Sequence, residues 1–231
     1  MQRIGPLVIT VDGPAAAGKS TVARRLARRL GFRYLDTGAM YRAATWKALQ
    51  AGVDMDDPDA VAAVAACARI ELVPDGEGLR VVCDGQDVTQ AIRTPEVTEN
   101  IYHVADPPAA RTPLIRQQRR LGRQFDLVAE GRDQGTEVFP DAEVKFYLDA
   151  SLEERVRRRV ADMARAGRPL SQDEVRRQVA DRDARDRARP VGALRKTDDM
   201  AVIDSTQMGV DEVVEAMAAE IARRGLAPGL S

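Results

Sequence analysis

The hydrophobic residues of this chain fall into two alternating patterns, short apolar runs and longer helical repeats. The run from Leu7 to Val11 is continuous and rich in β-branched residues, which is typical of a strand buried on both faces of a parallel sheet. Behind it, Val22, Leu26 and Leu30 recur at helical spacing and predict a helix that ends at Gly31. Similar patterns predict further strands at residues 32–35, 127–129, 144–148 and 201–204, and a last helix at about 210–223. The alternation predicts an α/β fold with a central parallel sheet.

The middle of the chain has a different pattern, which predicts a small antiparallel insertion. Two β-rich runs, Ile70 to Val73 and Leu79 to Cys83, flank a glycine-containing turn, as is typical of a hairpin. A second turn leads to a third short strand near Val88. An antiparallel meander does not belong in a parallel sheet, so a separate subdomain is expected here. The expected division is a core of residues 1–69 and 108–231 and an insertion of residues 70–107.

Composition narrows the class of protein. The chain of 231 residues is 44% hydrophobic but only 4% aromatic, so aliphatic side chains must build its core. Cys67 and Cys83 are the only cysteines and His103 is the only histidine, which excludes a disulfide framework and a four-ligand zinc site. This usage fits a reducing cytosol, and a cytoplasmic location is expected. The N-terminal apolar run is too short for a membrane span and lacks a cleavage-site pattern, so no membrane partner is expected.

The most specific candidate site is a loop between the first predicted strand and the first predicted helix. Glycine, four residues, glycine, lysine and serine follow one another from Gly13 to Ser20. In this context the loop N–H groups and the helix N-terminus converge on phosphate oxygens. Lys19 can then reach the β- and γ-phosphates, and the Ser20 hydroxyl can bind Mg²⁺. The alternative is a glycine-bearing turn without a ligand, which the flanking strand and helix disfavour. The residues expected to bind ATP are Gly13, Pro14, Ala15, Ala16, Ala17, Gly18, Lys19, Ser20 and Thr21.

Two further polar segments follow predicted strands. Residues 36–42 are expected to form a turn and the start of a helix, with Arg42 either near a ligand or in solvent. Residues 130–136 follow a buried strand and so lie at the carboxyl edge of the sheet, where open α/β sheets bind ligands. His103 lacks the glycine–serine elbow that would accompany a Ser-His-Asp triad, so a structural role is expected for it.

Arginine is concentrated late in the chain, with twelve arginines against six acidic residues in residues 155–189. Two interpretations compete: a pair of solvated helices with intrahelical ion pairs, or a mobile lid that brings arginines to transferring phosphates. Helical geometry favours the second, because one stripe begins with valines and continues with charges, and should line a polar cleft. That stripe consists of Val175, Val179, Arg182, Asp186 and Arg189. Candidate phosphate contacts on the preceding helix are Arg155, Arg158 and Arg159.

Taken together, these segments resemble those of bacterial cytidylate kinases, which phosphorylate CMP and dCMP. The matching segments are residues 13–21, 35–42, 92–97, 131–136 with 138–141, and 182–189. Their order and spacing match from near residue 8 to about residue 206, and the later segments are more specific than the phosphate loop, which many NTPases share. The resemblance implies a three-layer P-loop NTPase fold of the nucleoside monophosphate kinase type, with a nucleotide-binding insertion at 70–107 and a helical lid at about 155–189.

The resemblance also implies roles for individual residues. Asp133 and Arg111 resemble cytosine readers, and a carboxylate can accept a hydrogen bond from the cytosine N4 amino group, where uracil has a carbonyl. Tyr102 stands where the family usually has a serine, which bears on the choice between CMP and dCMP. The implied CMP contacts are Thr37, Arg42, Tyr102, Arg111, Arg132, Asp133, Arg182, Asp186 and Arg189. The implied catalytic residues are Lys19, Arg132 and Arg189.

The implied reaction is in-line transfer of the γ-phosphoryl group of ATP to the 5′-phosphate of CMP or dCMP, with Mg²⁺ as cofactor. The acceptor phosphate is already anionic near pH 7, so neutralising two anions matters more than a general base. One alternative is a P-loop kinase for another small acceptor, such as a coenzyme precursor or a shikimate-like compound. Another is a nucleotide-regulated RNA-binding module. The arginines alternate with acids and lack an aromatic stacking platform, so no nucleic-acid partner is expected. A monomer is expected.

Overall fold

The computed structural model describes residues 5–76 and 78–226, which divide into two compact units. The first, here the core unit, comprises the described residues up to 34 and from 125 onward. The second, here the middle unit, comprises the described residues of 35–124. Each unit is described by itself.

A five-stranded parallel sheet lies at the centre of the core unit. Its strands are β1 (Val8–Asp12), β2 (Arg33–Asp36), β6 (Leu127–Gly131), β7 (Val144–Asp149) and β8 (Ala201–Asp204), in the order β2-β6-β1-β7-β8. β1 pairs in parallel with β6 on one side and β7 on the other, so that Asp12 stands level with Gly131 and Tyr147. The predicted parallel sheet is confirmed, and three strand ends that precede polar loops meet at one edge.

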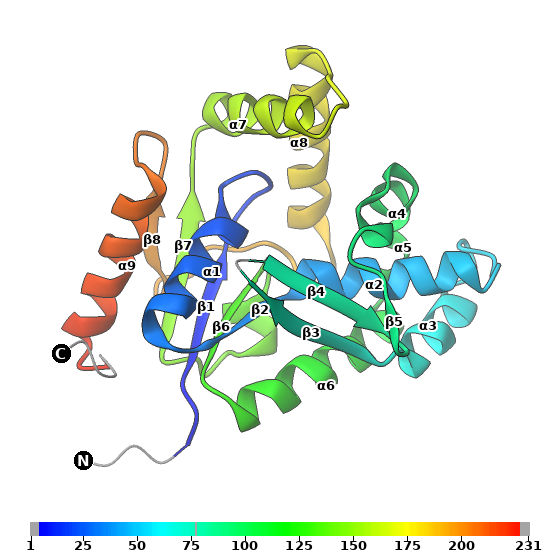
Figure 1. Ribbon diagram of the computed structural model, residues 1–231, viewed down its shortest axis with the longest axis horizontal. Helices are drawn as coiled ribbons and strands as arrows, with labels where there is room; N and C mark the ends of the chain where they lie inside the picture. The colour runs from blue at the N-terminus through cyan, green and yellow to red at the C-terminus, as the bar shows by residue number, and fades with distance from the viewer. Residues whose placement is uncertain (1–4, 77, 227–231) are drawn as a thin grey trace. The chain divides into compact units, whose positions relative to one another are not determined.

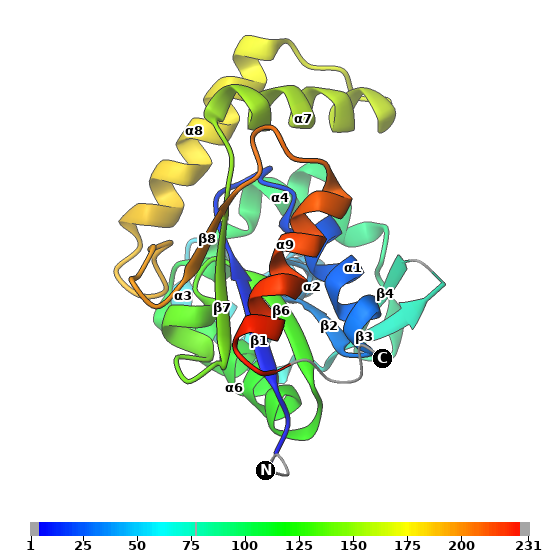
Figure 2. The same ribbon diagram turned by 90° about the vertical axis from the view of Figure 1, so that its left-hand side faces the viewer.

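Helices α1 (Lys19–Leu30) and α9 (Val210–Arg223) cover one face of this sheet (Figures 1 and 2). Leu26 of α1, Phe146 of β7 and Met217 of α9 belong to one buried cluster. α1 ends where the sequence predicted, because Gly31 adopts a left-handed φ of 69° and its N–H bonds carbonyls of the last helical turn. The core is mainly aliphatic, and it fixes the strand and helix on either side of the phosphate loop.

Helices α7 (Leu152–Arg165) and α8 (Gln172–Ala188) follow β7 and form a helical pair (Figure 2). Val156 of α7 packs with Val175 and Val179 of α8 in a small apolar cluster of their own. Val175 and Val179 are the apolar members of the stripe that the sequence predicted for this helix. At the start of α8, Ser171 and Glu174 form a reciprocal capping box, which satisfies backbone donors that the helix itself leaves unpaired.

The middle unit packs helices around a small antiparallel sheet. Its helices are α2 (Thr37–Gln50), α3 (Pro58–Cys67), α4 (Pro95–Asn100), α5 (Tyr102–Ala105) and α6 (Pro108–Gln124), with a 3-10 turn at Ala91–Arg93. Its strands are β3 (Ile70–Asp75), β4 (Gly78–Cys83) and β5 (Gln86–Asp87), in that order. Leu72 stands opposite Val81 in the antiparallel register. The predicted hairpin is confirmed, and the third strand lies just before its predicted place.

The start of α2 differs from the sequence-based expectation. Asp36 ends β2 and also caps α2 by accepting a hydrogen bond from the Ala39 N–H, so the strand passes straight into the helix instead of through a turn. In the middle unit, α3 packs along α6 and α2 contacts β4. The role of residues 70–107 as a nucleotide-binding insertion stays a prediction.

Candidate functional site

The phosphate loop connects β1 to α1 at the carboxyl edge of the core sheet (Figure 1). Gly13 starts the loop, and a Cβ atom at this position would lie 2.0 Å from the Leu148 carbonyl oxygen of β7. Only glycine lets the loop leave β1 so close to the neighbouring strand. Gly18 ends the loop in a left-handed conformation with φ 92° and caps α1. Glycine is therefore required at these two positions for different reasons: the lack of space at Gly13 and the left-handed conformation at Gly18. Together the two glycines place the loop over the N-terminus of α1.

Lys19 is a buried cation of the core unit whose pKa is far from its ordinary value. Its side chain is only 5% exposed, and its Nζ donates a hydrogen bond to the Pro14 carbonyl oxygen at 2.7 Å. The pKa of Lys19 falls from 10.5 to about 7, chiefly because burial disfavours the charged amine and also because the charge of Arg132 is close, while Glu130 acts in the opposite sense. An anion bound in the loop would restore the charged form of this amine.

Ser20 and Glu130 place two hard oxygen ligands beside the loop. The Ser20 hydroxyl donates to Glu130 Oε1 at 2.5 Å, and the Tyr34 hydroxyl donates to the same oxygen at 2.9 Å. Among the residues that the structure describes, no group of three or more His, Cys, Asp or Glu side chains could hold a metal ion. A metal here would therefore need phosphate oxygens or water to complete its coordination. Mg²⁺ is usually coordinated in this way at nucleotide sites. The sequence assigned no role to Glu130, although a carboxylate near the end of a buried strand was a usable signal.

Asp186 joins two of the predicted site arginines. Its Oδ2 accepts from Arg132 Nε at 2.7 Å, and its Oδ1 lies 2.6 Å from Arg189 Nη2. Burial acts to raise the pKa of Asp186, but Arg132 and Arg189 outweigh it and hold the pKa below its usual range. Burial likewise acts to lower the pKa of Arg132, and Asp186 reverses the direction. The structure thus brings together residues that are 54 positions apart in the chain, and the predicted stripe of α8 contributes Asp186 to a cluster in which the charges are paired.

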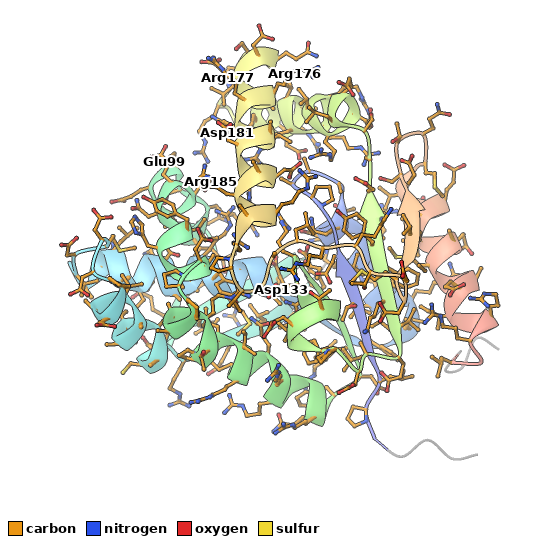
Figure 3. All side chains as sticks on the ribbon, turned by 180° about the vertical axis from the view of Figure 1, so that it is seen from behind. Glu99, Asp133, Arg176, Arg177, Asp181 and Arg185 are labelled. Atoms are coloured by element: carbon orange, nitrogen blue, oxygen red, sulfur yellow. The ribbon has the colours of Figure 1, made fainter. Side chains whose placement is uncertain are left out.

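Two further predicted residues lie near this cluster. Arg182 is half-buried on α8, and its charge acts on both Lys19 and Asp186. Asp133 is 3% exposed and follows β6, just before a π-helical turn at Gln134–Val138 (Figure 3). Beside it, Asp12 accepts hydrogen bonds from the Gln134 and Gly135 N–H groups at 2.9 and 2.7 Å. Asp12, which the sequence marked only as a strand end, ties the phosphate loop to the loop that carries Arg132 and Asp133.

The two faces of α8 differ. Arg177, Asp181 and Arg185 follow one another at four-residue spacing along one side of the helix and are exposed (Figure 3). Asp183 and Asp186 are each only 2% exposed on the inner side. The outer face of α8 is solvated, as the first interpretation expected, and its inner face buries charged side chains. The mobile lid that brings arginines to transferring phosphates stays a prediction.

Two of the three candidate arginines of α7 contact the phosphate loop. Arg155 is buried and donates to the Ala15 carbonyl oxygen at 3.1 Å, and Arg158 donates to the Ala17 carbonyl oxygen at 3.2 Å. Arg159 is half-buried. The expectation that these three side chains contact phosphate stays a prediction.

Four predicted CMP contacts belong to the middle unit. Thr37 is buried at the start of α2, and Arg42 donates to the Thr98 hydroxyl at 2.8 Å. Arg111 is buried, donates to the Ala105 carbonyl oxygen at 2.8 Å and lies over the Tyr41 ring at 5.4 Å. The ring of Tyr102 is 38% exposed and stacks on His103 with a centroid distance of 3.9 Å. His103 lies 3.8 Å from Asp56.

The fold and the loop define an α/β nucleotide-binding protein of the P-loop class. The comparison with protein families narrows this further: residues 9–223 match the cytidylate kinase family, and the chain belongs to that family. It is 49% identical to a cytidylate kinase of Rhodopirellula baltica over 209 residues, which cover 90% of each protein. It is 47% identical to a cytidylate kinase of Anoxybacillus flavithermus over 207 residues, covering 90% of this chain and 92% of that protein.

The chain is also similar to part of a longer protein and, in fold, to a solved structure. A bifunctional pantoate ligase/cytidylate kinase of Nostoc is 47% identical over 210 residues, but this chain spans only 39% of its length. A solved structure of an uncharacterized protein from Eubacterium ventriosum superposes with a TM-score of 0.53 at 11% identity, covering 94% of this chain and 98% of that one. The latter likeness concerns the fold alone. Across the described part of the chain, no helix is long and apolar enough to cross a membrane.

Proposed function

We propose that this protein transfers the γ-phosphoryl group of ATP to CMP or dCMP, giving ADP and CDP or dCDP. One observation supports it above the others: the charges of Arg132 and Asp186 act on Lys19 of the phosphate loop, and Asp186 pairs with both Arg132 and Arg189. A 5′-phosphate oxygen of the acceptor attacks the γ-phosphorus, and the bond from that phosphorus to the β–γ bridging oxygen breaks. No proton has to leave the acceptor, because its phosphate is ionised near pH 7.

The phosphates of the donor are assigned to the loop. Its N–H groups and Lys19 would bind the β- and γ-phosphates, and in bound ATP the lysine would be charged. The residues fit Mg²⁺, because the Ser20 hydroxyl and the Glu130 carboxylate are 2.5 Å apart and are both hard oxygen ligands. Bound Mg²⁺ would neutralise phosphate charge and orient the triphosphate. Ser20 and Glu130 would hold it.

The acceptor is assigned to the arginine cluster and to the predicted base readers. Arg132 and Arg189 would neutralise the transferring phosphoryl group, with Arg182 and Asp186 beside the acceptor sugar and phosphate. Asp133 would accept from the cytosine N4 amino group, together with Arg111, while Thr37, Arg42 and Tyr102 would complete the CMP contacts. Arg132 and Arg189 are held in place by Asp186 before any substrate binds, and this preorganisation is what transition-state charge stabilisation requires.

A coupled assay of ADP release tests the proposal. The purified protein is given ATP and Mg²⁺ with CMP, dCMP, UMP, AMP or shikimate, each at the same concentration. We expect turnover with CMP or dCMP, little with the other acceptors, and slow ATP hydrolysis without an acceptor. An absence of turnover with both cytidine nucleotides would remove the proposal, and the ratio of the two would show how Tyr102 affects the choice between them.

The cellular compartment and the oligomeric state are also part of the proposal. Cys67 and Cys83 are both free thiols, which fits a reducing compartment, and we propose a cytoplasmic enzyme that acts as a monomer with nucleotides as its partners. Size-exclusion chromatography with light scattering would test the monomer directly.

A further inference from the structure

The phosphate loop contains a residue in an unfavourable backbone conformation. Ala16 has a φ of 61°, and within residues 5–76 and 78–226 the only other non-glycine residue with positive φ is Asp84. For an alanine this left-handed conformation costs a free energy worth roughly a 5- to 30-fold change in an equilibrium constant. Something in the folded protein must therefore hold Ala16 there.

Three side chains of the lid helices hold the backbone on both sides of Ala16. Arg155 Nη1 donates to the Ala15 carbonyl oxygen at 3.1 Å, and Arg158 Nη1 donates to the Ala17 carbonyl oxygen at 3.2 Å. Asp183 Oδ1 accepts from the Ala15 N–H at 3.0 Å. We call Arg155, Arg158 and Asp183 the loop brace.

Arg155 and Asp183 are themselves fixed. They form an ion pair at 2.6 Å, and both are almost fully buried, at 5% and 2% exposure. Arg155 Nε also donates to the Ala150 carbonyl oxygen at 3.0 Å. This pair therefore joins α7 and α8 to each other and to Ala15, and neither charge is left without a partner, as burial demands.

Arg158 is anchored from the other side. Its Nη2 donates to the Ser205 carbonyl oxygen at 2.6 Å, its Nη1 to the Ser205 hydroxyl at 3.1 Å, and its Nε to Glu154 at 2.8 Å. The guanidinium is thus held between the loop after β8, its own helix and the phosphate loop. Two of its hydrogen bonds go to backbone carbonyl groups, those of Ala17 and Ser205, a geometry that suits a backbone support.

Because the peptide bond is planar, these contacts with loop carbonyl groups also fix the direction of the neighbouring loop N–H groups. In a planar trans peptide, the carbonyl and the following N–H point in opposite directions. When the brace draws the Ala15 carbonyl toward α7, the N–H of Ala16 points away from α7; the Ala17 carbonyl orients the N–H of Gly18 in the same way. The brace therefore sets the direction of loop donors that would meet phosphate oxygens.

We propose that Arg155, Arg158 and Asp183 are positioning residues that keep Ala16 in its left-handed conformation and so preorganise the phosphate loop for ATP. The inference rests on the proposed binding of ATP by this loop. It assigns Arg155 and Arg158 a role in orienting the backbone, in place of a direct contact with the transferring phosphate. Glycine at position 16 would need no such support, because left-handed φ is unstrained for glycine.

A double-mutant cycle tests the brace. Arg158→Gln and Asp183→Asn are each made with Ala16 and again with Ala16→Gly, and the dissociation constant for ATP is measured by calorimetry. We expect each brace substitution to weaken ATP binding about 10-fold in the Ala16 background, within the range set by left-handed strain, and less than about 3-fold in the Ala16→Gly background. CMP binding should change little in all variants. Arg157→Gln is the matched control, because Arg157 is 71% exposed and bonds the same Glu154, and it should leave ATP affinity unchanged.

The outcomes are distinct. An equal loss of ATP affinity in the two backgrounds would overturn the brace and indicate direct phosphate contacts. If wild-type protein fails to bind ATP at all, both this inference and the proposed function fall; if it binds ATP and the cycle is additive, only the inference falls. Thermal unfolding of each variant shows whether it is folded. If Arg158→Gln does not fold, the near-isosteric Asp183→Asn still decides between coupling and additivity.

Discussion

The lowered pKa of Lys19 makes proton uptake on ATP binding a sharp prediction. Burial is the main cause of the fall from 10.5 to about 7, and this shift corresponds to roughly 5 kcal/mol of penalty on the charged form at about 1.36 kcal/mol per pKa unit. At pH 8 an amine with a pKa of about 7 is about 0.9 neutral. The phosphates of ATP favour the charged amine, so binding at pH 8 should draw close to one proton from the buffer.

Calorimetry measures this directly. ATP is titrated into the protein at pH 8 in buffers of different ionisation enthalpy, and the slope of the observed enthalpy against that ionisation enthalpy gives the protons taken up. We expect an uptake of about 0.9 proton at pH 8 and about 0.1 at pH 6, where Lys19 is already charged. In the Lys19→Arg variant the cation stays charged at both pH values. If this variant still binds ATP, the binding should be accompanied by almost no proton uptake. An uptake near zero in the wild type at pH 8 would refute the argument.

The same shift has a consequence for stability, whose sign follows from linkage. The pKa of Lys19 is lower in the folded protein than in the unfolded chain, so between pH 7 and 10.5 the unfolded chain binds more protons, and this residue's contribution to stability rises with pH. Below pH 7 the amine is charged in both states, so the full cost of burying the charged amine lowers the free energy of unfolding. Lys19→Met should therefore raise the free energy of unfolding by about 1–3 kcal/mol at pH 6, less than the full penalty because the bond to Pro14 is lost, and the gain should shrink toward pH 10. Urea unfolding at both pH values measures this, and a gain that grew with pH would contradict it.

Three further predictions concern the loop, the metal and the arginine cluster. Gly13→Ala should destabilise the protein by about 3 kcal/mol or more, because its Cβ would lie 2.0 Å from the Leu148 carbonyl oxygen. Gly85→Ala, where nothing lies within 4 Å and only the φ of 84° is strained, should cost about 1 kcal/mol in the same thermal unfolding assay, and equal losses would contradict the steric argument. Glu130→Gln should raise the Mg²⁺ concentration needed for half-maximal turnover several-fold, since a neutral amide binds this ion more weakly; an unchanged Mg²⁺ titration would remove Glu130 from the metal site. Arg132→Ala should lower kcat/KM for CMP roughly 10³-fold or more while the protein stays folded, because Asp186 keeps its pairing with Arg189. Arg132→Lys should recover only part of this activity because its donors do not form a fork; normal turnover by the alanine variant would end the catalytic role of Arg132.

The parts of the site that the sequence predicted are those whose signals are local. The strand before Gly13 and the helix after Ser20 are adjacent in the chain, and their hydrophobic periodicities differ clearly. The inner stripe of α8 was also predictable, because Val175 and Val179 are followed by charge on the same face, and the buried Asp186 confirms it.

The parts that the sequence missed depend on contacts between distant segments. Asp183 follows Val179 by four residues and is as compatible with the inner face of α8 as Arg182, so helical periodicity could not choose between them. The structure buries Asp183 because its partners are the Ala15 N–H, 168 positions away, and Arg155. Backbone groups carry no sequence signal, so a side chain that recognises them is indistinguishable from one that awaits a phosphate.

The charge balance around Lys19 explains why this site is suited to an anion. The charges that act most on its pKa, apart from burial, are those of Arg132 and Arg182, which lower it, and of Glu130 and Asp186, which raise it. These opposite charges act against each other, so burial remains the largest effect and disfavours the charged amine. A phosphate oxygen would add negative charge beside the amine and favour its charged form without rearranging the four groups. The lowered pKa of Lys19 therefore indicates a site that is suited to an anionic ligand. This preference is local, because the formal net charge of the whole chain is only −1.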